Sequence, residues 1–235
     1  MTEFTKKYKD LVSSILEFGE EQECRNGSQL ILPHYSFTLN HSNYENHELK
    51  LRKMFYKGVK GEFGTLIDGK LVTNVSQFEA NGCNYWKLWG NENGNINIDY
   101  SNKMQPQLND IIELIKADPT SRRLHVELWD HFNVQNNFLS LPCCWHGLTF
   151  SVINNTLHLK WTQRSVDTML GLPADVYLSY LFMEYVANLC DLQIGTCMYS
   201  LSNVHVYLEH VEDANVLLQR TEDDWNLPLK FELKA

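Results

Sequence analysis

The stretch LSLPCCWHGLTFSVINNTLHLKWTQRSVDTMLGLPAD, residues 139–175, contains a Pro-Cys-Cys turn, an apolar hairpin and a polar cluster, in that order. Alternating apolar residues predict strands at 148–153 and 157–161, and the Asn154-Asn155 pair between them is typical of a tight turn. Such a hairpin places Cys144, at the start of one strand, beside Arg164, at the end of the next. Because a guanidinium near a thiol favours the nucleophilic thiolate, the stretch predicts a reactive cysteine. The alternative is a structural cysteine beside a surface arginine.

The order of the polar residues around this hairpin is more specific than its chemistry. Pro142-Cys143-Cys144 is followed by Gln163-Arg164-Ser165-Val166-Asp167 and then by Leu170-Gly171-Leu172-Pro173. This order resembles the thymidylate synthase superfamily. The resemblance implies an α/β (α+β) fold, in which a large mixed β-sheet is flanked by helices and packs against a second sheet in a homodimer. It also implies roles for particular residues: Cys144 as nucleophile, Gln163, Arg164, Ser165 and Asp167 at the nucleotide, and Asp167 and Gly171 at the folate.

Length and composition indicate a single globular domain, residues 1–235. The chain is 43% hydrophobic and 12% aromatic, and its formal net charge of −9 argues against nucleic acid as a partner. The six cysteines form no Cys-x-x-Cys pair and no zinc pattern, so we expect reduced thiols and no metal. A polar N-terminus and the lack of a long apolar run predict a soluble cytoplasmic protein without a membrane partner. If a phage encodes the chain, this would be the host cytoplasm.

The first 61 residues contain one candidate ligand for the substrate. Residues 1–23 show the apolar spacing of an amphipathic helix, and residues 24–28 predict a turn before a strand at 30–32. By the resemblance, Arg25 in this turn holds the nucleotide phosphate, although a plain surface turn is the alternative. Three histidines that follow have poor spacing for a metal site and are expected to be solvated: His34, His41 and His47.

The general base is expected at Glu62. By the resemblance, Glu62 opens a helix that ends at Gly69, although Gly64 and Thr65 stand where larger residues are usual. Glu48 is the competing candidate, but the number of residues between it and the next segment that resembles the family, residues 84–94, fits the family less well.

Residues 84–94 resemble a Trp-x-x-Trp segment of the family, in which Trp86 packs beside the folate. Tyr100 follows this segment as a second folate contact. Lys87 is a candidate contact to a folate carboxylate.

Two further segments complete the implied nucleotide site. A helix at 108–116 ends at Asp118-Pro119, and Arg122 and Arg123 precede a strand at 124–129. By the resemblance, this arginine pair reaches across the dimer interface to the partner's nucleotide phosphate; the alternative is an interface salt bridge to Glu127 or Asp130. A core helix is expected at 176–189 and a strand at 198–202. His205 and Tyr207 then resemble the family pair that grips the ribose hydroxyl.

Three departures from the synthase pattern suggest the substrate. Asp175 stands where synthases carry Asn, and a carboxyl matches the N3 acceptor and N4 donor of cytosine better than those of uracil. Trp145 replaces the His that follows the nucleophile, and the C-terminal segment after Arg220 is short. Asp175 and the short C-terminal segment resemble the phage dCMP hydroxymethylases, which use 5,10-methylenetetrahydrofolate as co-substrate, whereas Trp145 suggests a changed handling of the methylene intermediate. The alternatives are a thymidylate synthase or dUMP hydroxymethylase, and a catalytically silent nucleotide-binding or interaction protein of the same fold.

Overall fold

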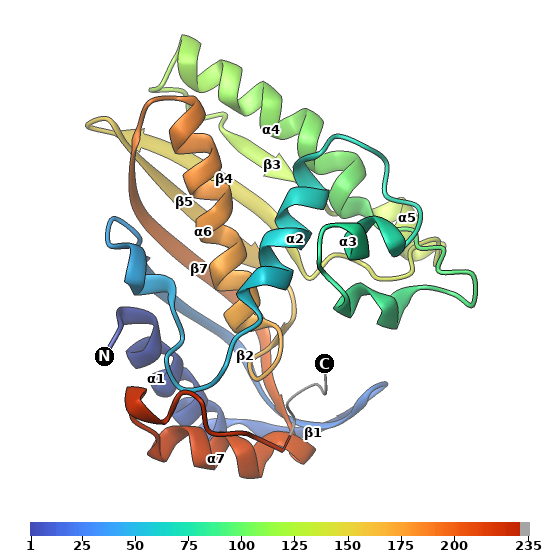
Figure 1. Ribbon diagram of the computed structural model, residues 1–235, viewed down its shortest axis with the longest axis vertical. Coiled ribbons are helices and arrows are strands. Elements are labelled where there is room, and N and C mark those ends of the chain that lie inside the picture. The colour runs from blue at the N-terminus through green and yellow to red at the C-terminus, as the bar shows by residue number, and fades with distance from the viewer. Residues whose placement is uncertain (231–235) are drawn as a thin grey trace.

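A seven-stranded mixed sheet forms the centre of the protein (Figure 1). The computed structural model describes residues 1–230, except for the side chain of Asn102. The strands run in the order β1-β2-β7-β5-β4-β3, and β6 pairs with β7 off this path. Neighbours are antiparallel except β5–β7 and β6–β7, which are parallel. The strands are β1 Glu20–Cys24, β2 Gly27–Asn40, β3 His125–Glu127, β4 Trp145–Ile153, β5 Thr156–Gln163, β6 Val166–Asp167 and β7 Gln193–Tyr207.

Helices cover this sheet, which confirms the predicted fold class. The α-helices are α1 Glu3–Phe18, α2 Tyr56–Ile67, α3 Ser76–Ala80, α4 Asp99–Ala117, α5 His131–Gln135, α6 Leu172–Leu189 and α7 Val211–Gln219. Short 3₁₀ helices are η1 Tyr44–His47, η2 Tyr85–Trp89, η3 Leu208–His210 and η4 Glu222–Asp224. In Figure 1, α6 crosses the sheet in front of β5 and β7, α2 lies beside α6, and α1 and α7 lie together at the opposite end from α4. Within residues 1–230, no helix is both long and apolar enough to cross a membrane.

The predicted hairpin is confirmed as β4 and β5. Ile153 pairs with Thr156, and the two residues between them, Asn154 and Asn155, have φ angles of 50° and 59°. Asparagine tolerates this left-handed region, which a two-residue hairpin turn requires at both positions. The inward-facing side chains of the hairpin are buried in the core: Leu148, Phe150, Leu157, Leu159 and Trp161.

Helix α6 is the central core helix, as predicted, but it begins at Leu172 rather than Val176. Pro173 occupies its first turn, where a missing backbone N–H costs nothing. The helix is apolar almost all round, because the sheet covers one side and α2 another. This earlier start places Asp175 in the first turn of the helix.

Six other predicted elements have different boundaries in the structure. The first helix ends at Phe18 rather than residue 23, because Gly19 leaves the helix in an extended conformation and residues 20–24 pair with β2. Helix α2 begins at Tyr56, six residues before Glu62. The other four elements are present but differ in length from their predicted ranges. These ranges were 30–32 for β2, 108–116 for α4, 124–129 for β3 and 198–202 for β7.

The prediction that His41 and His47 are solvated is wrong. Their relative exposures are 2% and 1%, whereas His34 is exposed as expected. His41 shares a 3.0 Å hydrogen bond with the Tyr199 hydroxyl, and the ring of His47 stacks on Tyr180 at 4.2 Å between centroids. Burial lowers the pKa of His41 to about 3 and that of His47 to about 4, so both rings are neutral. Over residues 1–230, no group of three or more His, Cys, Asp or Glu side chains is arranged to hold a metal ion.

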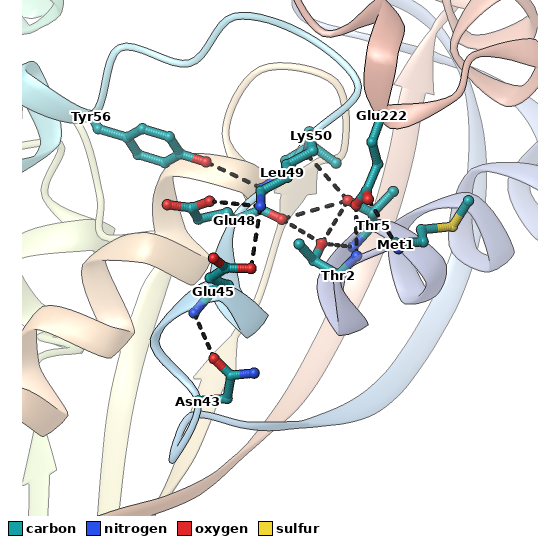
Figure 2. Close-up of polar contacts among 10 residues, drawn as sticks. All are labelled: Met1, Thr2, Thr5, Asn43, Glu45, Glu48, Leu49, Lys50, Tyr56 and Glu222. Atoms are coloured by element: carbon teal, nitrogen blue, oxygen red, sulfur yellow. Dashed lines mark hydrogen bonds and ion pairs between the residues drawn. The ribbon is translucent and has the colours of Figure 1, made fainter.

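The segment that leads into α2 is fixed by the start of α1 (Figure 2). The hydroxyl of Thr2 donates to the carbonyl of Glu48 at 2.7 Å, and the N–H of Lys50 donates to the hydroxyl of Thr5 at 3.1 Å. The backbone N–H of Thr2 donates to Glu222 at 2.6 Å, which adds the C-terminal region to the same network. Residues 45–50 are therefore held from two sides before the chain enters α2.

Two glycines in α2 are in contrasting surroundings. A Cβ on Gly61 would lie 2.2 Å from the backbone oxygen of Asn81, so α2 approaches residues 81–83 too closely for any side chain at this point. A Cβ on Gly64 would meet nothing within 4 Å. The close approach at Gly61 fixes the position of its neighbour, Glu62.

We expect Gly61→Ala to destabilise the protein by roughly 2 kcal/mol or more, because the backbone of residue 81 must shift. The matched variant Gly64→Ala should stabilise it by about 0.5–1 kcal/mol, since alanine loses less backbone entropy in a helix. Urea unfolding of both variants followed by circular dichroism measures the two changes. Equal effects of the two substitutions would contradict the packing described for Gly61.

Candidate active site

Cys144 lies immediately before β4 and is half-buried. Its backbone N–H donates to the hydroxyl of Tyr100 at 2.6 Å, and its carbonyl accepts the backbone N–H of Arg164 at 2.9 Å. The second bond extends the β4–β5 hairpin by one step. The predicted proximity of Cys144 and Arg164 is therefore confirmed, and it results from the hairpin register.

The guanidinium of Arg164 is held in place by three groups. Its Nε donates to the carbonyl of Cys143 and its Nη2 to that of Pro142, both at 2.9 Å. The ring of Trp129 lies against it, with 5.3 Å from the guanidinium carbon to the ring centroid. These contacts keep a fixed positive charge next to the nucleophile.

The thiol of Cys144 is nevertheless not predisposed to ionise. Burial raises its pKa to about 11, and the charges of Asp175 and Asp167 act in the same direction, whereas Arg164 lowers it. The predicted effect of Arg164, which favours the thiolate, is present, but it does not bring the pKa of Cys144 below that of a free thiol. The desolvation of the thiol outweighs a single neighbouring cation.

Asp175 lies close enough to Cys144 for its charge to affect the thiol, and its carboxyl is oriented by Gln163. The amide nitrogen of Gln163 donates to Asp175 Oδ2 at 2.7 Å and to the carbonyl of Ser165 at 3.2 Å. The amide oxygen accepts the indole N–H of Trp161 at 3.1 Å, which fixes the orientation of the amide. Burial raises the pKa of Asp175 to about 8, so the protonated carboxyl is the main form at neutral pH.

Glu62, in the middle of α2, also belongs to this group. Its side chain is 8% exposed, and its charge contributes to the raised pKa of Asp175. Oε1 accepts the indole N–H of Trp86 at 2.9 Å, and Oε2 accepts the hydroxyl of Tyr85 at 2.5 Å. Burial raises the pKa of Glu62, and these two hydrogen bonds oppose the rise. The sequence had suggested no role for Tyr85.

The competing candidate, Glu48, lies elsewhere. Its carboxylate forms an ion pair with Lys50 at 3.5 Å in the segment before α2, where Figure 2 shows it beside the N-terminal network. It is not among the groups whose charge affects Cys144 or Asp175. The structure therefore brings Glu62, and not Glu48, close to Asp175.

The expected folate contacts fall into two groups. Trp86 and Tyr100 are 4% and 3% exposed, and Trp86 stacks on Phe78 at 4.7 Å, so both rings present little surface to a ligand. Asp167, at the end of β6, and Gly171, in the loop before α6, are half-buried. Oδ1 of Asp167 accepts the backbone N–H groups of Met169 and Leu170 at 2.9 and 3.0 Å, which shapes this loop. The folate roles of all four residues stay predictions. Lys87 pairs instead with Glu79 at 2.7 Å.

His205 and Tyr207 lie near the end of β7, beside the same loop. His205 pairs with Asp167 of β6 on one side, and its Nδ1 lies 2.8 Å from the carbonyl of Asn203. Tyr207 pairs with Gln29 of β2, two residues after the hairpin turn that carries Arg25. Arg25 is exposed on this turn, and its predicted contact with a phosphate stays a prediction.

Arg122 and Arg123 are exposed in the loop between α4 and β3. Within the described residues, neither side chain forms an ion pair with Glu127 or Asp130, because Glu127 contacts His146 and His125, and Asp130 pairs with Lys103. No described hydrogen bond or ion pair joins either arginine to the Cys144 site of its own chain. Their contribution to a partner's site, and the homodimer itself, stay predictions.

Trp145 belongs to the core. Its ring lies 4.7 Å from that of Trp161 and 4.5 Å from that of Tyr100. His146 points to the other face of β4, where Nδ1 lies 3.2 Å from a carboxylate oxygen of Glu127. His146 therefore faces away from Trp145 and does not replace the histidine that synthases carry after the cysteine.

The site therefore combines a cysteine, a fixed guanidinium and two buried carboxyls on one side of a mixed sheet. A family model for thymidylate synthase matches residues 6–234, nearly the whole chain. This family catalyses folate-dependent one-carbon transfer to C5 of pyrimidine nucleotides, with methylenetetrahydrofolate as donor. On this match over almost all of its length, the chain belongs to the thymidylate synthase family.

Proposed function

We propose that the protein is a dCMP 5-hydroxymethyltransferase: 5,10-methylenetetrahydrofolate, water and dCMP give 5-hydroxymethyl-dCMP and tetrahydrofolate. The observation that carries the proposal is the Asp175 carboxyl, which is half-buried at the start of α6 and oriented by Gln163 at 2.7 Å. The resemblance to synthases places Asn at this position. The identity of this side chain is therefore the main argument for cytosine over uracil.

The carboxyl of Asp175 matches the Watson–Crick edge of cytosine. Since burial raises its pKa to about 8, it carries a proton at neutral pH and offers one O–H donor and one oxygen acceptor. Because Gln163 donates to Oδ2, the donor is Oδ1–H, which suits the N3 acceptor of cytosine, and the N4 amino group can donate to the carboxyl. Uracil presents an N–H donor at N3, which would leave two donors facing each other.

Cys144 supplies covalent catalysis. Its thiolate forms a bond to C6 of the pyrimidine, and the electron pair of the C5–C6 bond makes C5 nucleophilic. The bound folate supplies a one-carbon unit at the oxidation level of formaldehyde. Loss of the C5 proton and of the folate amine leaves an exocyclic methylene on the pyrimidine. Water adds to this carbon, and expulsion of Cys144 restores the ring. No hydride is transferred, so tetrahydrofolate is released unoxidised.

Glu62 is the proposed proton acceptor and donor of this sequence. It lies with Asp175 and Cys144 in a buried group, and its carboxylate is held by Tyr85 and Trp86. Asp167 and Gly171 are the accessible residues of the predicted folate set. Trp145 supports the hydroxymethyl product, because its indole cannot relay a proton as the synthase histidine does.

Asp175→Asn is expected to lower kcat/KM for dCMP by at least about 100-fold and to raise it for dUMP, because a polar site rejects a mismatched edge strongly. Tritium release from C5 of each nucleotide, with methylenetetrahydrofolate present, measures both constants. Asp68→Asn on the surface is the control. If the wild-type protein releases tritium from dUMP but not from dCMP, the proposal is refuted and the substrate is a uracil nucleotide. Formation of dihydrofolate would indicate methyl transfer.

Glu62→Gln is expected to lower kcat by about 100-fold or more, since the site then lacks its proton acceptor. Glu48→Gln should leave kcat within about a factor of three of the wild type, because its carboxylate pairs with Lys50 away from Cys144. The same tritium-release assay compares the two variants. The opposite ranking would assign the base to Glu48.

Alkylation of Cys144 by iodoacetamide is expected to accelerate about tenfold per pH unit from pH 7 to 10, because the reactive thiolate is the minor form below a pKa of about 11. Arg164→Met should slow the reaction further, since it removes the charge that lowers the pKa. Peptide-resolved mass spectrometry reports the rate at this residue. An alkylation rate that levels off near pH 7 would show that the thiol is already ionised.

Two further outcomes would contradict the proposal. If Cys144→Ser leaves turnover unchanged, the covalent mechanism is wrong. If dCMP binds to the wild type but is not converted, the protein is a catalytically silent family member.

A further inference from the structure

We infer that Tyr85 is a positioning residue for Glu62: its hydroxyl orients the carboxylate and donates the hydrogen bond that stabilises its charge during proton transfer. The inference rests on the proposed role of Glu62 as general base. It adds a residue that the sequence did not indicate.

Two consecutive residues bind the two oxygens of one carboxylate. Tyr85 and Trp86 open the short helix η2, and they contact Oε2 and Oε1 of Glu62 at 2.5 and 2.9 Å. An indole N–H only donates, so Oε1 must accept. With both oxygens bound, the carboxylate has one orientation relative to α2. Because the carboxylate is almost fully buried, such pre-organised donors have more effect than they would in water.

The hydroxyl of Tyr85 has a second neighbour, the thiol of Cys83. Cys83 is fully buried, and burial raises its pKa to about 12, so its sulfur keeps a proton that it can donate to the Tyr85 hydroxyl. The tyrosine oxygen can therefore accept from the thiol while its own proton points to Glu62. This arrangement favours the donor orientation of Tyr85 that an ionised Glu62 requires.

The electrostatic surroundings of Glu62 make this donor important. The titratable groups that face it are Asp175 from α6 and Tyr85 and Cys83 from the segment at η2. None of these groups carries a positive charge. Burial raises the pKa of Glu62, and the hydrogen bonds from Tyr85 and Trp86 lower it. Removal of the Tyr85 hydroxyl must therefore raise the pKa of Glu62. When the solution is acidified, the Glu62 carboxylate is then protonated at a higher pH than in the wild type.

Tyr85→Phe removes only this hydroxyl. We expect the acid limb of the pH profile of kcat/KM for C5 tritium release to move up by about one pH unit. We also expect kcat near neutral pH to fall by about tenfold, with KM changed less than about threefold, because Tyr85 is not among the residues proposed to bind the substrate. Tyr85→His keeps a ring N–H donor, and its acid limb should lie closer to that of the wild type.

Tyr180→Phe is the matched control, because it removes another tyrosine–glutamate hydrogen bond, the 2.8 Å contact to Glu184 on α6. Its profile should superimpose on that of the wild type. The inference is overturned if the profile of Tyr85→Phe does not move, if Tyr180→Phe moves it equally, or if Tyr85→His lies further from the wild type than Tyr85→Phe.

A direct titration separates this inference from the proposed function. The carboxyl carbon of Glu62, labelled with ¹³C and assigned by its absence in Glu62→Gln, reports the protonation of the carboxyl by NMR without any substrate. An upward shift of its titration in Tyr85→Phe supports the inference even if no nucleotide turns over, in which case the proposed function fails alone. An unchanged titration overturns the inference even if the wild type converts dCMP.

Discussion

The backbone hydrogen bond from Arg164 to Cys144 determines the geometry of the site. It extends the β4–β5 hairpin by one pair beyond Trp145 and Gln163. The same register sets Gln163 on the inner face of β5, where its amide meets the carboxyl of Asp175 at the start of α6. A slip of one residue would turn these side chains to the opposite face of the sheet. Cys144, Arg164 and, through Gln163, the carboxyl of Asp175 are thus positioned by one strand pairing.

The acidic groups of the site share a single desolvated region. The charges of Glu62 and Asp167 raise the pKa of Asp175. Those of Asp175 and Asp167 raise the pKa of the Cys144 thiol, which Arg164 lowers. Removing these groups from water costs free energy, which the hydrogen bonds from Gln163, Tyr85 and Trp86 partly offset. The protein without ligand therefore keeps its thiol and one carboxyl neutral, so activation of the nucleophile depends on what else enters the site.

The sequence allowed the hairpin and the core helix to be predicted, because these depend on local alternation, an Asn-Asn turn and a long apolar run. The fold class was predicted from the resemblance of residues 142–173 to the thymidylate synthase superfamily. The predictions from sequence failed where contacts between distant segments determine the burial or the pKa of a side chain. His41 and His47 look like surface residues, but tyrosines of α6 cover them. The thiol pKa could not be predicted because desolvation depends on tertiary packing. Tyr85 was missed because an aromatic residue beside two tryptophans looks like core, and only the fold shows that its hydroxyl meets Glu62.

The strand order has a consequence for how the chain acquires this fold. Strand β7 is the last in the sequence but lies between β2 and β5, so the two halves of the sheet share no edge until it inserts. During synthesis, the edges of β2 and β5 that later pair with β7 have unpaired backbone groups until residue 207 has left the ribosome. Such non-local pairing slows folding and leaves open edges that bind other chains. We therefore expect nascent chains of this protein to depend on chaperones more than a sheet of the same size built from sequential hairpins.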